Sequence, residues 1–117
     1  MNTNMYGWLL GMASVLVPLA APAATDCHGT VTNALLYGDG SLNVRGSWRG
    51  DFTVLCNTNG TFGGIPGEIC LSWYATAIKS IETGKSANVY YAATYSCTAL
   101  PTYWSSPVPT YFGLQNT

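Results

Sequence analysis

Charged side chains are scarce in this sequence, and their scarcity excludes several classes of protein. The 117 residues include only four Lys or Arg and five Asp or Glu, which give a net charge of −1. A basic surface for nucleic acid is therefore absent, and so is the high net charge of a disordered chain. Because 48% of the residues are apolar, the surface must be largely uncharged polar or aromatic, which favours a neutral ligand or self-association.

The sequence also lacks the motifs of catalytic and metal-binding proteins. It has a single histidine, His28, with no Gly-x-Ser-x-Gly motif and no Cys-x-x-Cys pair. A catalytic nucleophile needs a base that is oriented by a third group, and one histidine between Cys27 and Gly29 does not suggest such a set. The cysteine spacing matches no zinc pattern. We therefore expect no enzymatic activity, no cofactor and no metal.

The N-terminal segment has no Lys or Arg, yet it carries the other marks of an export signal. Residues 8–21 form an uncharged apolar run, and Ala21-Pro22-Ala23 has the small-x-small pattern that signal peptidase cleaves. We expect a signal peptide over residues 1–23, one mature domain over residues 24–117, and a secreted or periplasmic location. An uncleaved anchor is the alternative, and we expect no membrane span in the mature part.

The pattern of the mature part predicts three strands, one helix and two further strands. Period-two alternation and β-branched or aromatic runs predict strands over residues 30–37, 41–48, 52–56, 87–92 and 111–114. Pro66 to Thr83 is predicted to be the helix, followed by Gly84 as its C′ residue. This is the element order of an OB-fold, so we expect a mainly β, OB-fold-like five-stranded barrel with one α-helix between strands three and four.

Four cysteines in a small exported chain predict two disulfide bonds, for which three pairings are possible. The expected fold favours one of them. In the OB order the first strand lies beside the fourth, so Cys27, before the first strand, is near Cys97, after the fourth. The loop that ends at Cys70 returns to the end of the third strand, where Cys56 lies. We therefore expect Cys27–Cys97 and Cys56–Cys70.

The predicted helix is apolar around about 200° of its circumference, whereas a helix on a single core needs an apolar stripe of about 100° or a little more. Two explanations fit this width. Either the helix contacts another subunit as well as its own core, or it is deeply embedded in a monomer. Together with the low surface charge, the first explanation predicts a homo-oligomer.

Residues 52–92 carry a resemblance to a known group of proteins. They contain Cys56, a glycine-rich loop, Cys70, the predicted helix and then Thr83-Gly84-Lys85-Ser86-Ala87-Asn88-Val89-Tyr90-Tyr91. This arrangement resembles the B subunits of subtilase cytotoxin and typhoid toxin, which are exported bacterial OB-fold proteins. Those B subunits form ring pentamers, bind sialylated glycans on host cells and carry a separate enzymatic A subunit. The stretch Ser47-Trp48-Arg49-Gly50-Asp51 is also similar to short exported bacterial proteins of unassigned role.

The resemblance implies a pentamer that binds a host-cell glycan and an exported partner subunit. Tyr91 matches a position that contacts the glycan in those B subunits, while packing in the core beside Val89 is the alternative. His28, before Gly29-Thr30-Val31, stands where they have a serine in strand one shortly before a Gly-Val run, and an exposed residue beside a disulfide is the alternative there.

An aromatic loop supplies further candidate ligand-binding residues. The segment between the last two predicted strands contains three prolines together with Tyr103 and Trp104 among Ser and Thr residues. Aromatic rings pack against the apolar C–H faces of sugars, and neighbouring polar groups bind the hydroxyls; a simple cap over the barrel is the alternative. Arg49-Gly50-Asp51 spells an integrin-type tripeptide, but we expect its charged side chains to serve the local turn.

These observations together predict an exported, non-catalytic binding module, similar to a glycan-binding toxin B subunit. Its candidate ligand-binding residues are Tyr91, Trp104, Tyr103 and His28. The alternative is an exported structural or protein-interaction oligomer with no sugar site.

Overall fold

The computed structural model describes residues 23–116. The expected signal peptide therefore lies outside the described residues apart from Ala23. The elements of the described part follow one another as β1 (Thr25–Gly29), β2 (Val31–Leu36), β3 (Ser41–Gly46), β4 (Arg49–Asn57), α2 (Gly67–Thr83), β5 (Ala87–Tyr91), η2 (Cys97–Ala99) and β6 (Tyr111–Leu114). No helix in this part of the chain is long and apolar enough to cross a membrane.

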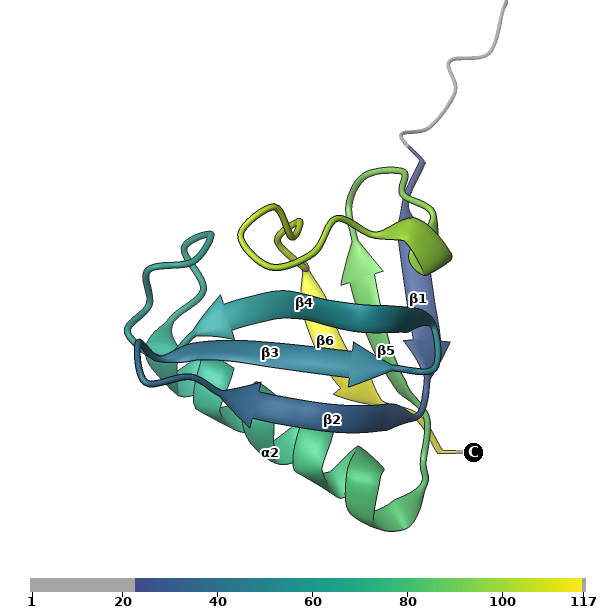
Figure 1. Ribbon diagram of the computed structural model, residues 1–117, viewed down its shortest axis with the longest axis horizontal. Coiled ribbons are helices and arrows are strands. Elements are labelled where there is room, and N and C mark those ends of the chain that lie inside the picture. Colours follow the sequence, from purple (N-terminus) through teal and green to yellow (C-terminus); the bar gives the residue numbers. More distant parts are fainter. Residues whose placement is uncertain (1–22, 117) are drawn as a thin grey trace, which may run out of the picture.

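The strands form two antiparallel sheets that lie crosswise to each other (Figure 1). One sheet has the order β1-β5-β6 and the other the order β2-β3-β4. The helix α2 contacts strands of both sheets, so one core forms between the inner faces of the sheets and the helix. The largest fully buried apolar side chains of this core are Tyr91, Leu42, Leu55, Leu100, Val31, Val44 and Val89.

The predicted OB-fold barrel is wrong. The described chain has six strands instead of five, the helix follows the fourth of them, and the two sheets do not close into a barrel. The additional strand is β1, which lies before the predicted first strand and pairs with β5. The chain passes from one sheet to the other at Gly29, where φ is 156° and the side chains of Ser47 and Trp48 occupy the space that a Cβ would need.

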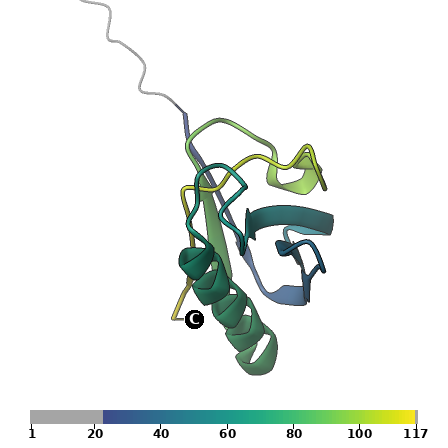
Figure 2. The same ribbon diagram turned by 90° about the vertical axis from the view of Figure 1, so that its left-hand side faces the viewer.

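The outer edge of β4 explains why the barrel stays open. A loop lies along this edge in place of a strand (Figure 2). The Tyr103 N–H donates to the Phe52 carbonyl at 3.3 Å, and the Val54 N–H donates to Ser106 Oγ at 2.9 Å. The loop, residues 101–109, contains three prolines, which have no N–H to donate to a sheet ladder. It therefore covers β4 without joining it to β6.

The predicted helix is confirmed, and it is fastened to the sheets at both ends. Near its N-terminus Cys70 is bonded to Cys56 of β4. Near its C-terminus Ser80 Oγ accepts a hydrogen bond from the Val31 N–H at 3.1 Å and donates one to the Lys85 carbonyl at 2.7 Å. The helix ends at Gly84 in the left-handed conformation (φ 74°), as its sequence predicts. These contacts fix α2 against β2 and β4.

The predicted disulfide pairing is confirmed. Cys27 is bonded to Cys97 with a Cα–Cα distance of 5.6 Å, and Cys56 to Cys70 with 5.5 Å. The first bond fastens β1 to η2, and the second fastens β4 to α2. The first pairing follows because Cys27 lies opposite Val89 of β5, and the chain that leaves β5 reaches Cys97 a few residues later.

Candidate functional site

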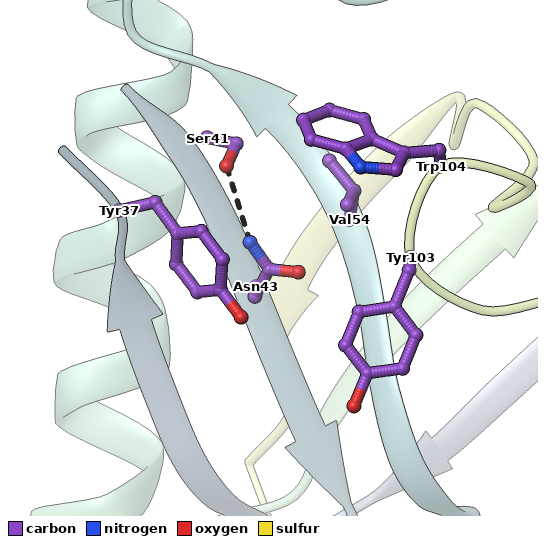
Figure 3. A pocket seen from close by; sticks show the side chains of 6 residues that line it. All are labelled: Tyr37, Ser41, Asn43, Val54, Tyr103 and Trp104. Atoms are coloured by element: carbon purple, nitrogen blue, oxygen red, sulfur yellow. Dashed lines mark hydrogen bonds between the residues drawn. The ribbon is translucent and has the colours of Figure 1, made fainter. Parts of the chain in front are cut away.

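A small cleft lies on the face of the β2-β3-β4 sheet that points away from the core (Figure 3). On β3, Leu42 and Val44 belong to the core cluster, so Ser41 and Asn43, which alternate with them, belong to the opposite face. Val54 of β4 is the partner of Asn43 in the sheet register and lines the cleft with them. The empty space measures about 210 Å³, with the solvent at its mouth included.

Three aromatic side chains form the walls of this cleft. Tyr37 comes from the turn between β2 and β3, and Tyr103 and Trp104 come from the loop beside β4. Figure 3 shows Tyr37 on one side of Asn43 and the other two rings on the opposite side. Trp104 is 73% exposed and Tyr37 41% exposed. The rings therefore offer apolar surface to a ligand instead of filling the core.

The floor of the cleft is a short chain of hydrogen bonds. Asn43 Nδ2 donates to Ser41 Oγ at 3.2 Å, and Ser41 Oγ donates to Asp39 Oδ1 at 2.8 Å. The Ser41 N–H also donates to Asp39 Oδ1 at 2.9 Å. These two donors, the N–H first, hold the pKa of the Asp39 carboxyl below its ordinary value. Asn43 Oδ1 accepts no hydrogen bond from another residue in 23–116 and points away from Ser41 (Figure 3).

Tyr103 occupies a strained position that its neighbours hold in place. Its φ of 53° is in the left-handed region, which a non-glycine residue rarely adopts. Its hydroxyl donates to Asp51 Oδ1 at 2.9 Å, and its carbonyl accepts from Ser106 Oγ at 2.6 Å. The Phe52 N–H and then the Tyr103 hydroxyl lower the pKa of Asp51, while the hydrogen bond to Asp51 raises the pKa of Tyr103.

The Arg49-Gly50-Asp51 tripeptide serves this loop. Arg49 Nε donates to the Leu100 carbonyl at 3.0 Å, at the beginning of the aromatic loop. Asp51 accepts from Tyr103 in the same loop and from the Phe52 N–H at 2.8 Å. Both charged side chains therefore position the segment that carries Tyr103 and Trp104.

The structure brings together two of the four residues predicted from sequence. Tyr103 and Trp104 both line the cleft, and the sequence analysis missed Tyr37, Ser41 and Asn43. A signal for Asn43 was present, because the alternation of residues 41–48 places it opposite the buried face. No signal in the sequence connects Tyr37 to Trp104, since a sheet edge and a loop from distant segments bring them together.

Tyr91 lies in the core and does not reach the cleft. It is 1% exposed, and its ring packs edge-on against Tyr95 with the centroids 5.6 Å apart. Its hydroxyl makes no hydrogen bond within the described residues. Burial raises the pKa of Tyr91 far above its ordinary value, and the nearby Thr53 hydroxyl offsets this only in part. Thr53 Oγ1 instead donates to the Val44 carbonyl, at 3.5 Å. The core-packing alternative therefore describes this residue.

His28 lies on the outer face of the other sheet. It is exposed on β1, opposite Asn88 of β5. On the same face Asn88 Nδ2 donates to Asp26 Oδ1 at 2.8 Å, and the rings of Tyr90 and Tyr111 stack with centroids 5.0 Å apart. His28 therefore belongs to a separate surface, on the β1-β5-β6 sheet.

The chain matches no protein family, no curated protein and no solved structure in comparisons with each of these groups. Within residues 23–116 no group of three or more His, Cys, Asp or Glu side chains could hold a metal ion. The arrangement of the cleft itself therefore carries the functional argument.

Proposed function

We propose that this protein is an exported, non-catalytic module that binds carbohydrate in the cleft of the β2-β3-β4 sheet. The observation that carries the proposal is the pairing of exposed aromatic rings, above all Trp104, with the polar, uncharged floor formed by Ser41 and Asn43. Aromatic rings pack on the apolar C–H face of a sugar, while amide and hydroxyl groups bind its hydroxyls.

The charges around the cleft support a neutral ligand. None of the six lining residues is charged, and the two nearby carboxylates already accept hydrogen bonds from the protein. Binding should therefore change little with salt concentration, because screening acts on exposed charges. A shallow site on a small domain makes few buried contacts, so we expect dissociation constants in the range of about 1 mM to 1 μM.

Export and the cellular role form the second part of the proposal. Two disulfide bonds are typical of proteins in an oxidising compartment, which supports a secreted or periplasmic location. We propose a host-cell glycan as the ligand and an exported partner subunit, as the resemblance of residues 52–92 to toxin B subunits implies. The cleft is independent of that resemblance, because most of its lining residues lie outside this stretch.

A glycan array tests the proposal directly. The mature protein, residues 24–117, is applied to neutral and sialylated glycans at low and high salt. We expect binding to neutral glycans at both salt concentrations, and loss of that binding in Trp104→Ala. An array on which no glycan binds the folded wild-type protein contradicts the proposal.

Exposed apolar side chains on α2 support a second candidate function, the formation of a structural or protein-interaction oligomer. Three large apolar side chains of this helix are exposed: Ile69, Leu71 and Ile81. Burial of these residues against another subunit would explain the wide apolar arc of the helix, and the resemblance implies a pentameric ring. Light scattering at about tens of micromolar tests it, since hydrophobic association depends on concentration. A strictly monomeric mass contradicts assembly and leaves the carbohydrate proposal in place.

A further inference from the structure

We infer that Asn43 Oδ1 determines which sugar the cleft binds, by accepting a hydrogen bond from one sugar hydroxyl. This inference rests on the proposed carbohydrate-binding function and names the residue that gives the site its specificity.

Asn43 lies between the aromatic walls of the cleft. The Tyr37 and Trp104 rings stand on opposite sides of Asn43 (Figure 3), and all three residues line the cleft. A sugar that packs on these rings therefore lies over the Asn43 amide.

The hydrogen bonds of the floor fix which end of the Asn43 amide faces the ligand. The Ser41 hydroxyl has one proton and donates it to Asp39 Oδ1, so its oxygen can only accept from Asn43. The amide must then turn its NH2 group toward Ser41 and its oxygen toward the cleft. A flipped amide would place two acceptors against each other. Asp39 therefore sets the orientation of the Asn43 amide through two successive hydrogen bonds, with Ser41 between them.

The open oxygen can accept a hydrogen bond from a ligand. Among residues 23–116 the only buried side-chain polar atom without a partner is the Tyr91 hydroxyl, so the unpartnered Asn43 Oδ1 is in contact with solvent in the cleft. A sugar hydroxyl can replace that solvent and donate to the oxygen. None of the residues that line the cleft is charged, so this contact needs no charge on the sugar.

Calorimetric titration with defined sugars tests the inference. The probes are methyl glycosides of glucose, galactose, mannose and N-acetylglucosamine. Asn43→Leu should weaken binding about tenfold or more, as expected when a buried hydrogen bond is lost. Asn33→Leu, on β2 of the same sheet, is the matched control and should bind as the wild type.

Monodeoxy sugars on the wild-type protein give a second test that needs no variant to fold. One deoxy position should reproduce the loss seen in Asn43→Leu, and that variant should no longer distinguish the deoxy sugar from its parent. If Trp104→Ala abolishes binding while Asn43→Leu and every deoxy sugar bind normally, the inference is wrong and the proposed function stands. If no sugar binds at all, the proposed function fails and the inference fails with it.

Discussion

The outer faces of the two sheets have similar compositions but different bonding. On the β1-β5-β6 sheet the Tyr90 and Tyr111 rings stack on each other, and Asn88 is hydrogen-bonded to Asp26. On the β2-β3-β4 sheet no ring stacking joins the three aromatic residues of the cleft within the described chain, and Asn43 keeps an open acceptor. On the first face the aromatic rings and the amide contact each other or a neighbouring side chain. On the second face apolar ring surface and one hydrogen-bond acceptor are free to contact a ligand.

This difference shows why a count of aromatic and polar residues does not locate a binding site. From composition alone both faces look equally suitable as binding sites, because each carries tyrosines beside amides and carboxylates. What distinguishes them is whether each group already has a partner, and only the three-dimensional arrangement reveals this.

The largest expected effect concerns the two disulfides, one on each sheet. Replacing Cys27 and Cys97 by Ser opens a loop with a sequence separation of 70, and replacing Cys56 and Cys70 opens one with a separation of 14. Loop-closure entropy predicts losses of about 4 and about 3 kcal/mol in the free energy of unfolding. Urea denaturation of the two double variants measures both values. A larger loss for the Cys56–Cys70 pair would contradict this order.

The comparison of the outer faces predicts opposite results for two aromatic substitutions. Trp104→Ala removes an exposed ring with no stacking partner in the described chain, so glycan affinity should fall at least about tenfold, which corresponds to about 1.4 kcal/mol. Tyr111→Ala removes a ring that is 44% exposed, against 73% for Trp104, from the other sheet and should leave the affinity unchanged. Titration with the best glycan from the array compares them. An equal loss in both variants would remove the distinction between the faces.

A smaller effect is expected in the core between the sheets. Tyr91→Phe removes a buried hydroxyl that has no partner among residues 23–116. Such a group costs free energy in the folded state, so the variant should be as stable as the wild type or more stable by up to about 1 kcal/mol, with unchanged glycan binding. Thermal unfolding measures the stability. A clear destabilisation would show that the hydroxyl is hydrogen-bonded in solution.

The smallest effect concerns the pH dependence of the Tyr103–Asp51 hydrogen bond. The folded-state pKa of Asp51 is lowered, so its contribution to stability is present above its unfolded pKa and is lost as the pH falls through the folded value. The pKa of Tyr103 is raised from 10.0, so the contribution of its neutral phenol is lost as the pH rises through the folded value.

Asp51→Asn should therefore return the pKa of Tyr103 toward 10.0. The NMR shifts of the Tyr103 ring measure this pKa, and Asp39→Asn is the control because Asp39 has no part in this bond. An unchanged pKa in Asp51→Asn would show that the carboxylate does not accept from Tyr103 in solution.

The sequence contained the information for most of the local structure. The alternation at Leu42 and Val44, the helix that ends before Gly84, and the disulfide pairing were all predicted correctly. The architecture was not, because the strand content of residues 25–29 depends on pairing with β5, a segment far along the chain. Residues 101–109 were correctly predicted as a loop, but their position along β4 depends on contacts such as that between Ser106 and Val54.

The candidate site could be predicted only in part for the same reason. Composition identified Tyr103 and Trp104, since aromatic residues among Ser and Thr in a predicted loop are a composition that suits a sugar-binding site. Tyr91 was a candidate because of the resemblance, yet the strand periodicity that places it beside Val89 also places it in the core. The open oxygen of Asn43 depends on the hydrogen bond that the Ser41 hydroxyl donates to Asp39, and this arrangement has no signature in the sequence.

The tryptophans of the described residues provide a fluorescence signal for ligand binding in the cleft. Trp48 and Trp73 are buried, whereas Trp104 stands exposed at the cleft. A soluble quencher should therefore extinguish the emission of Trp104 alone, and the remaining emission should be that of tryptophan in an apolar environment. A ligand that covers Trp104 would protect it from the quencher, so occupancy of the cleft could be followed by fluorescence without a label.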